Sequence, residues 1–133
     1  MSKNDLYYAA GLVDGEGTVT LIRQTRHQKR SPSISVSSTS EELVDFMKDT
    51  FGGHIVKLKP PKKGHRQAWH WQTSHDNAIK TLKQIAPYLR ERKKKARANL
   101  ILRDYKRVTP RNGKYTEKQL KRKEEFATQF FEI

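Results

Sequence analysis

Apolar residues alternate with polar ones in two neighbouring segments near the N-terminus. In residues 17–26, Val19 and Leu21 fall on one side of an extended chain, and polar side chains fall mainly on the other. In the next segment, Ile34 and Val36 alternate with serines. Both segments therefore predict strands that have one apolar and one polar face.

Elsewhere the apolar positions recur every three or four residues, which is the period of a helix. Thr39 with Glu42, and Thr116 with Gln119, have the spacing of capping boxes that begin helices, and Gly52 can end one. We expect a helix from Asn4 or Asp5 to Asp14, helices at about 39–51, 76–89, 93–105 and 116–131, strands at 54–59 and 66–73, and a turn at 60–64.

This order predicts an α+β fold, αββαββα followed by further helices. Its four-stranded antiparallel sheet would have helices on one face and a free, polar and basic face on the other. We expect Trp69 and Trp71 to pack beneath the helices. Residues 1–108 would form the core domain, and residues 109–133 a loop and helix that pack on it.

Composition narrows the possible functions. The absence of cysteine excludes disulfides and thiolate metal sites. The sequence shows neither an apolar stretch of membrane-spanning length nor a signal-peptide pattern. We therefore expect an intracellular protein of the cytoplasm or an organellar matrix, neither secreted nor bound to a membrane. No phosphate-binding loop of the GxxxxGK[ST] type occurs, so we expect no nucleotide cofactor.

The charge balance points to an acidic polymer as partner. Twenty-eight Lys and Arg residues oppose fourteen Asp and Glu residues, which gives a net charge of +14. Nucleic acid is the favoured partner because the bases cluster along the chain. An anionic membrane is less favoured, since no basic amphipathic helix with a broad aromatic face is present.

Residues 9–18, Ala-Ala-Gly-Leu-Val-Asp-Gly-Glu-Gly-Thr, carry the most informative local pattern. Gly11 and Gly15 would share one face of a helix, where the lack of side chains lets a second backbone approach. Glu16 would stand at the helix end, where a partner helix could bring a second carboxylate. Paired carboxylates suit hard divalent cations. For Asp14, hydrogen bonding at the helix end is the favoured interpretation.

The segment from Ala9 to Gly17 resembles the signature of the LAGLIDADG homing endonucleases. The resemblance extends in order over roughly residues 5–107. The later matching segments are Gly17–Thr20, Phe51–Gly53, Trp69–Gln72 and Pro87–Leu89, followed by a basic helix. It implies that family's fold, in which the antiparallel sheet is saddle-shaped. Because the chain has one copy of the motif, it also implies a symmetric homodimer. The expected dimer interface comprises Ala10, Gly11, Asp14 and Gly15.

The resemblance also assigns roles near this motif. Glu16 takes the position of an essential acid that is usually Asp, and it would bind Mg²⁺ together with the backbone carbonyl of Gly15. Mn²⁺ could replace Mg²⁺, and Ca²⁺ would be a non-productive substitute. Ser38 would position water. Counting along the basic segment places the family's catalytic lysine at Arg92, with Lys93 next; phosphate binding by these two residues is the open alternative.

The polar face of the sheet is the expected DNA-binding surface, because a sheet ribbon fits the major groove. A merely solvated face is the alternative. The residues expected to face DNA are Thr18, Thr20, Ile22, Gln24, Arg26, Ser33, Ser35, Ser37, Lys57, Lys59, His70 and Gln72.

Together these features predict a homodimeric, metal-dependent, sequence-specific endonuclease. It would make a double-strand break in DNA at a long pseudo-palindromic target. The alternative is a non-catalytic nucleic-acid-binding module of the same fold, either an intron RNA maturase or a DNA-binding regulator. A structural basic protein, such as a ribosomal component, would explain the charge but not the order of Gly11, Gly15, Glu16 and Gly17.

Overall fold

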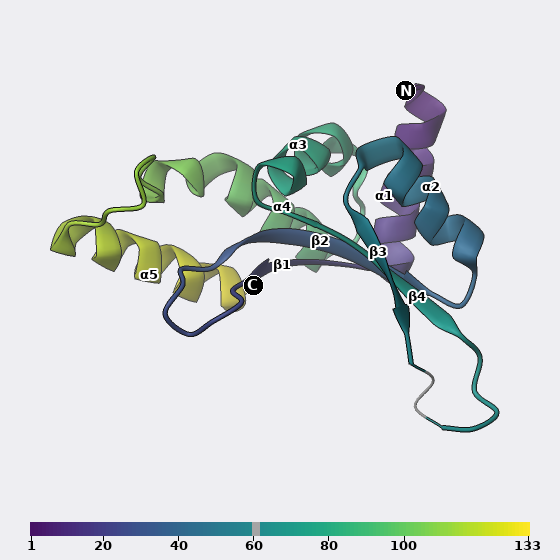
Figure 1. Cartoon of the computed structure of the whole chain (residues 1–133). Coiled ribbons are helices and arrows are strands. Elements are labelled where there is room, and N and C mark those ends of the chain that lie inside the picture. Colours follow the sequence, from purple (N-terminus) through teal and green to yellow (C-terminus); the bar gives the residue numbers. More distant parts are fainter. Residues whose placement is uncertain (60–61) are drawn as a thin grey trace.

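The predicted order of helices and strands is confirmed. A computed structural model describes residues 1–59 and 62–133 of the chain (Figure 1). Its elements are α1 (Lys3–Glu16), β1 (Gly17–Ile22), β2 (Ser31–Ser38), α2 (Glu41–Phe51), β3 (His54–Leu58), β4 (Ala68–Ser74), α3 (His75–Ile85), the 3-10 helix η1 (Ala86–Tyr88), α4 (Arg92–Asp104), the 3-10 helix η2 (Lys106–Val108) and α5 (Glu117–Phe131). None of the described helices is long and apolar enough to cross a membrane.

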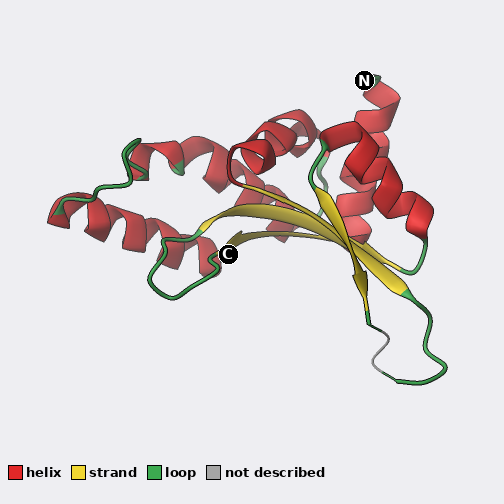
Figure 2. Ribbon diagram, in the orientation of Figure 1, coloured by secondary structure: helices red, strands yellow, loops and turns green. Residues whose placement is uncertain are grey.

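The four strands form one open antiparallel sheet in the order β1-β2-β4-β3. Helices α1, α2 and α3 pack on one face of this twisted sheet (Figure 2). Helix α4 contacts β1, and α5 packs against α4 and η2. The expected α+β fold, with a single sheet and helices on one of its faces, is therefore confirmed.

The alternation of apolar and polar residues in β1 and β2 is also confirmed. Val19, Leu21, Ile34 and Val36 are at most 2 % exposed and face the helices. Trp71 lies in the same layer and is fully buried, and its indole N–H donates to the carbonyl of Gly52 at 2.8 Å. Trp69 is half-buried against this core. Both tryptophans thus pack beneath the helices, as predicted.

Several element ends differ from the prediction. Helix α1 begins after Ser2, whose hydroxyl accepts from the backbone N–H of Asp5, and it continues through Glu16. The expected Thr39–Glu42 capping box is wrong, because Ser40 is the N-cap residue and its side chain makes no capping bond. The Thr116–Gln119 capping box is confirmed. Both helices are present where the sequence predicts them, but the residue that caps a helix can differ by one position from the predicted one.

The turn expected at residues 60–64 is described only in part, since residues 60 and 61 lie outside the described residues. Gly64 has a φ of +91°, a conformation that favours glycine. The predicted strand 66–73 is shorter at its start and runs one residue further, at 68–74.

The C-terminal segment joins the same hydrophobic core as the sheet. Phe126 and Phe130 of α5 are buried in it. The guanidinium of Arg97 in α4 lies over the Phe130 ring, 4.8 Å from its centroid, and donates to the carbonyl of Val19. Arg97 thereby links β1, α4 and α5. The division of the chain at residue 108 stays a prediction.

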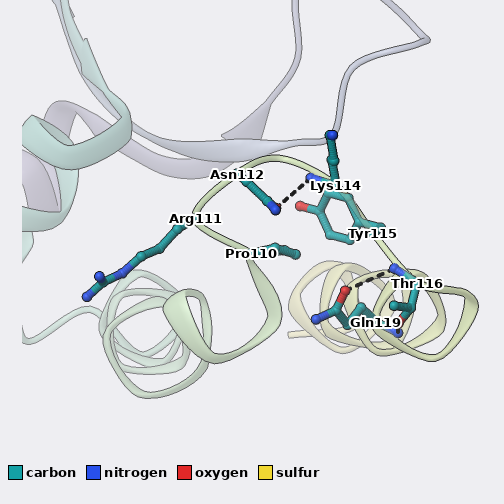
Figure 3. Close-up of a pocket in the computed structure, with 7 residues that line it drawn as sticks. All are labelled: Pro110, Arg111, Asn112, Lys114, Tyr115, Thr116 and Gln119. Carbon is teal, nitrogen blue, oxygen red and sulfur yellow. Dashed lines mark hydrogen bonds between the residues drawn. The ribbon is translucent and has the colours of Figure 1, made fainter.

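The loop before α5 lines a surface pocket (Figure 3). Within it the side-chain oxygen of Asn112 accepts from the backbone N–H of Lys114, next to the capping box. On the neighbouring side, Lys123 of α5 donates to the hydroxyl of Thr109, and its ammonium lies 4.0 Å from the Tyr105 ring centroid. Burial lowers the pKa of Lys123 to about 8.

Candidate functional site

The end of α1 is tied to the start of α4 by one carboxylate. The two oxygens of Asp14 accept from the backbone N–H groups of Arg90 and Glu91, at 2.9 and 3.1 Å. The expected hydrogen-bonding role of Asp14 is therefore present, although its partners lie 76 and 77 residues away rather than within the helix end. These bonds engage the carboxylate within its own chain rather than at the expected dimer interface.

Lys94 is the basic residue that the structure brings to the end of the motif. Its ammonium donates to the backbone carbonyl of Asp14 at 2.6 Å, one residue before Gly15. The C-terminal end of a helix carries partial negative charge, which favours a cation there. Arg92 and Lys93 are exposed, and within the described residues their side chains make no hydrogen bond to α1.

Local structure explains why counting along the chain does not reach Lys94. Glu91 caps α4 by accepting from the backbone N–H groups of Lys93 and Lys94, and the Lys94 N–H keeps the pKa of the Glu91 carboxyl below its ordinary value. The helix thus begins at Arg92. From there Lys94 shares a stripe with the buried Ala98 and Ile101, at i+4 and i+7. This spacing is the sequence signal that identifies the inward-facing lysine.

Glu16 and Gly15 lie at the exposed C-terminal end of α1. The last carbonyls of a helix have no intrahelical partner, so an exposed carboxylate and a free carbonyl stand side by side in sequence. These hard oxygen donors fit Mg²⁺. Nowhere in residues 1–59 and 62–133 do three or more His, Cys, Asp or Glu side chains gather as a metal-binding group.

Ser38 lies at the same end of the sheet as Glu16, because Gly17 is paired with Val36. It stands opposite Trp69, on the helix side of the sheet. Its hydroxyl oxygen accepts from the backbone N–H of Ser40 at 3.0 Å. This contact shapes the turn into α2, and the water-positioning role of Ser38 stays a prediction.

The two faces of α1 differ in a way that bears on dimerisation. Ala9, Ala10 and Val13 are at most 1 % exposed, so Ala10 packs inside its own chain rather than at the expected interface. Gly11 and Gly15 are exposed, and a Cβ added at either would meet no atom within 4 Å. Nothing within the described chain therefore requires glycine at these two positions.

Aromatic residues flank this open face. Tyr7 and Tyr8 are 49 % and 48 % exposed. Their rings make edge-to-face contacts with Tyr88 and Phe46, respectively. Exposed glycines between exposed aromatic rings form a surface that a second helix could approach closely.

Strand register determines which side chains share the polar face. Thr18 stands opposite Ser35, Ser35 opposite Gln72, and Gln72 opposite His54. Directly opposed residues point to the same side of an antiparallel sheet. The expected residues that lie on this face are Thr18, Thr20, Ile22, Ser33, Ser35, Ser37, His70 and Gln72.

Four residues expected on this face lie elsewhere. Strand β1 ends at Ile22, where its pairing with β2 stops, so Gln24 and Arg26 lie in the β1–β2 loop. Lys57 stands opposite Trp69 and belongs to the helix side of the sheet, and Lys59 follows the end of β3. A shift of one residue in the pairing of a strand moves each of its side chains to the other face of the sheet. The pairing of β3 with β4 therefore determines the face on which Lys57 lies.

The residues that β3 does present on the polar face are His54, Val56 and Leu58. The face of the sheet is therefore largely uncharged, which corrects the expected basic surface. Basic side chains gather instead at its two ends. The β1–β2 loop carries Arg23, Arg26, Lys29 and Arg30, and the region after β3 carries Lys59, Lys62, Lys63 and Arg66.

Two hydrogen bonds order the central strands of this face. The Ser37 hydroxyl lies 2.6 Å from Nδ1 of His70, and the Gln72 side-chain amide donates to the Ser33 hydroxyl at 2.9 Å. Ser33 is only 1 % exposed, so it supports Gln72 rather than standing free. Burial, with a smaller effect of nearby His54, lowers the pKa of His70 and so favours the neutral form of its ring.

The described structure is similar to solved structures of homing endonucleases. One is I-CvuI in complex with the I-CreI target, with a TM-score of 0.73 and 18 % identity over 97 % of this chain and 81 % of that one. Another is I-SmaMI, a LAGLIDADG homing endonuclease bound to cleaved DNA, with a TM-score of 0.59 and 18 % identity over 96 % of this chain and 48 % of that one. The chain has the LAGLIDADG homing endonuclease fold.

A further similar structure is that of the archaeal intron-encoded homing endonuclease I-Vdi141I complexed with DNA. Its TM-score is 0.64, with 16 % identity over 98 % of this chain and 84 % of that one. No protein-family model matches the sequence, and no curated protein matches it. The likeness therefore concerns the LAGLIDADG fold, and the activity has to be argued from the residues of this chain.

Proposed function

We propose that this protein is a homodimeric, divalent-metal-dependent endonuclease that cuts both strands of DNA at a specific site inside the cell. The observation that carries the proposal is the end of α1, where exposed Glu16 and the Lys94 ammonium accompany a glycine face open to a second chain. A twofold axis beside Gly11 and Gly15 would bring together two copies of Glu16.

Oxygen donors of this kind support phosphodiester hydrolysis. Glu16 and the Gly15 carbonyl would hold Mg²⁺, which when bound polarises a phosphate and lowers the pKa of water. Mn²⁺ would substitute for it, and Ca²⁺ would support binding without cleavage. Lys94, with its flexible ammonium, would stabilise negative charge on the phosphate as the bond breaks. Hydrogen bonds from Arg90 and Glu91 to Asp14 would keep α1 and α4 in this relation.

The polar face of the sheet would lie in the major groove, over a long pseudo-palindromic target made of two half-sites. Uncharged side chains such as Thr18 and Gln72 can exchange hydrogen bonds with base edges, which carry the sequence information. The basic side chains at both ends of the sheet would contact phosphates, which fix the register. The separation of uncharged side chains on the face from basic side chains at its ends is consistent with separate contacts to bases and to phosphates.

A non-catalytic binding module is the second candidate, acting as an intron RNA maturase or a DNA-binding regulator. It is favoured by the engagement of Asp14, which leaves Glu16 as the motif's one exposed carboxylate in each chain. The presence of exposed Glu16 at the end of the motif helix argues the other way, since a pure binder gains nothing from an acid next to phosphate.

Incubation with a randomised duplex library separates these candidates. With Mg²⁺ the protein should cut a defined subset of duplexes, and with EDTA it should not. Glu16→Gln should lose cleavage at least about a thousandfold, because several kcal/mol of transition-state stabilisation depend on the metal. The exposed Glu117 gives the matched control, and Glu117→Gln should cut normally. Duplex protection without cleavage by the wild type would favour the regulator, and preference for folded intron RNA would favour the maturase.

A further inference from the structure

The polar face of the sheet ends in an apolar edge on β3. Val56 and Leu58 are 47 % and 38 % exposed, and both lie on the face that carries Thr18, Ser35 and Gln72. Large aliphatic side chains of a strand are normally used for packing. In the described chain these two side chains face solvent.

The side chains on this face differ in chemistry from strand to strand. On β1, Thr18 offers a hydroxyl. On the central strands, His70 and Gln72 are bonded to serines of β2. On β3, His54 stands opposite Gln72, and the aliphatic Val56 stands directly opposite His70. Val56 and Leu58 can therefore recognise a partner by apolar contact, whereas Thr18 recognises by hydrogen bonding.

The major groove of DNA presents one apolar group, the C5-methyl of thymine. Basic residues that follow β3, including Lys62, Lys63 and Arg66, give this end of the sheet the charge that suits phosphates. We propose that Val56 and Leu58 contact thymine methyl groups and so select thymine at defined positions of each half-site. This inference rests on the proposed DNA-binding function and adds a base preference to it.

Replacing thymine by uracil tests the inference, because it removes the methyl group and leaves base pairing intact. The binding site is first selected from a randomised duplex library with the Glu16→Gln variant, so that binding is measured without cleavage. Each thymine of that site is then replaced singly by uracil. At one or two positions of each half-site, affinity should fall about fourfold, as expected for one buried methyl group. A 5-methylcytosine–guanine pair at the same position should restore only the methyl-dependent part.

Side-chain truncation assigns the effect to β3. Val56→Ala and Leu58→Ala remove exposed side chains, so the fold should be retained, and each should abolish the uracil effect at its own position. Thr18→Ala, on the same face but on β1, is the comparison variant: it should weaken duplex binding through its own lost contact and still retain the uracil effect.

The outcomes separate this inference from the proposed function. Tight duplex binding that is indifferent to uracil at every position would overturn the thymine contact and leave the endonuclease proposal standing. The thymine contact is also overturned if Val56→Ala and Leu58→Ala keep the full uracil effect, or if they change the number of protein copies in solution, which would make the patch a contact between chains. No duplex binding at all would overturn both proposals.

Discussion

The end of α1 and the polar face of the sheet are built on opposite principles. At the helix end a few groups, Glu16, Lys94 and Asp14, have single roles, and Lys94 and Asp14 are fixed by hydrogen bonds to backbone atoms. On the sheet, many side chains from four strands would, under the proposed function, each contribute one modest contact to DNA. A change at the helix end should therefore have a large effect, and a change on the face a small, graded one.

The largest effect is expected from closing the glycine face of α1. In Gly15→Leu the new Cβ meets no atom of its own chain within 4 Å, so the monomer should fold, and leucine should even favour the helix. A second helix could no longer approach, so double-strand cleavage should be lost. Sedimentation of the variant should show single chains.

Gly17 offers a contrasting control for that experiment. A Cβ there would lie 2.8 Å from Cα of Val13 and 3.1 Å from the carbonyl oxygen of Ser35. Gly17→Ala should therefore lower the free energy of unfolding by roughly 1–3 kcal/mol through overpacking, as measured by denaturant titration. If Gly15→Leu still sediments as a dimer and cuts both strands, the open face of α1 is not an interface with a second copy.

The next effect concerns Lys94. Lys94→Met keeps the aliphatic stem and removes the ammonium that contacts Asp14, so cleavage should slow by about a hundredfold or more, while duplex affinity changes little. Single-turnover cleavage and equilibrium binding measure the two quantities. Lys93→Met, one residue away and exposed, is the matched control. A larger loss of cleavage rate in Lys93→Met than in Lys94→Met would support the role that the count along the basic segment assigns to Arg92 and Lys93.

The smallest effect is expected where contacts are spread out. Replacing Lys62 and Lys63 by alanine should weaken binding similarly for all sequences. Because two lysines are lost from each of two chains, the slope of log affinity against log salt should fall by about 4. Lys48 and Lys83 belong to helices on the opposite face of the sheet, so their replacement by alanine should leave the slope unchanged. A sequence-dependent loss in the first variant would mean that these lysines contact base edges.

The same contrast explains how far the sequence alone can lead. The faces of β1 and β2 follow from strict alternation, and the glycines of α1 follow from the signature motif. Strand β3 is harder, because Ile55, Val56 and Leu58 are all apolar and give no consistent period of two. Its orientation is set by pairing with β4, which places Val56 opposite His70. The register of β3 therefore depends on both paired strands and does not follow from the sequence of β3 alone.

Counting along the basic segment misses Lys94 for a different reason. A count of residues from Pro87 assumes that the direction of each side chain in the segment is known. In the structure these directions follow from the helix α4, which begins after its N-cap residue Glu91. Asp14 shows the same limitation, since its residue type predicts hydrogen bonding but not the distant partners Arg90 and Glu91. The long-range contacts of Asp14 leave no periodic trace in the sequence, whereas the spacing of Lys94 from the buried Ala98 and Ile101 does indicate its side of α4.

The most direct test of the central claim is the number of chains bound to one selected duplex, measured by sedimentation of the complex together with the strands that it cuts. Two copies per duplex, with both strands cut in Mg²⁺ and neither cut by the Glu16→Gln variant, is the predicted result. A single copy that cuts both strands would contradict the account, because the two Glu16 carboxylates could not then meet.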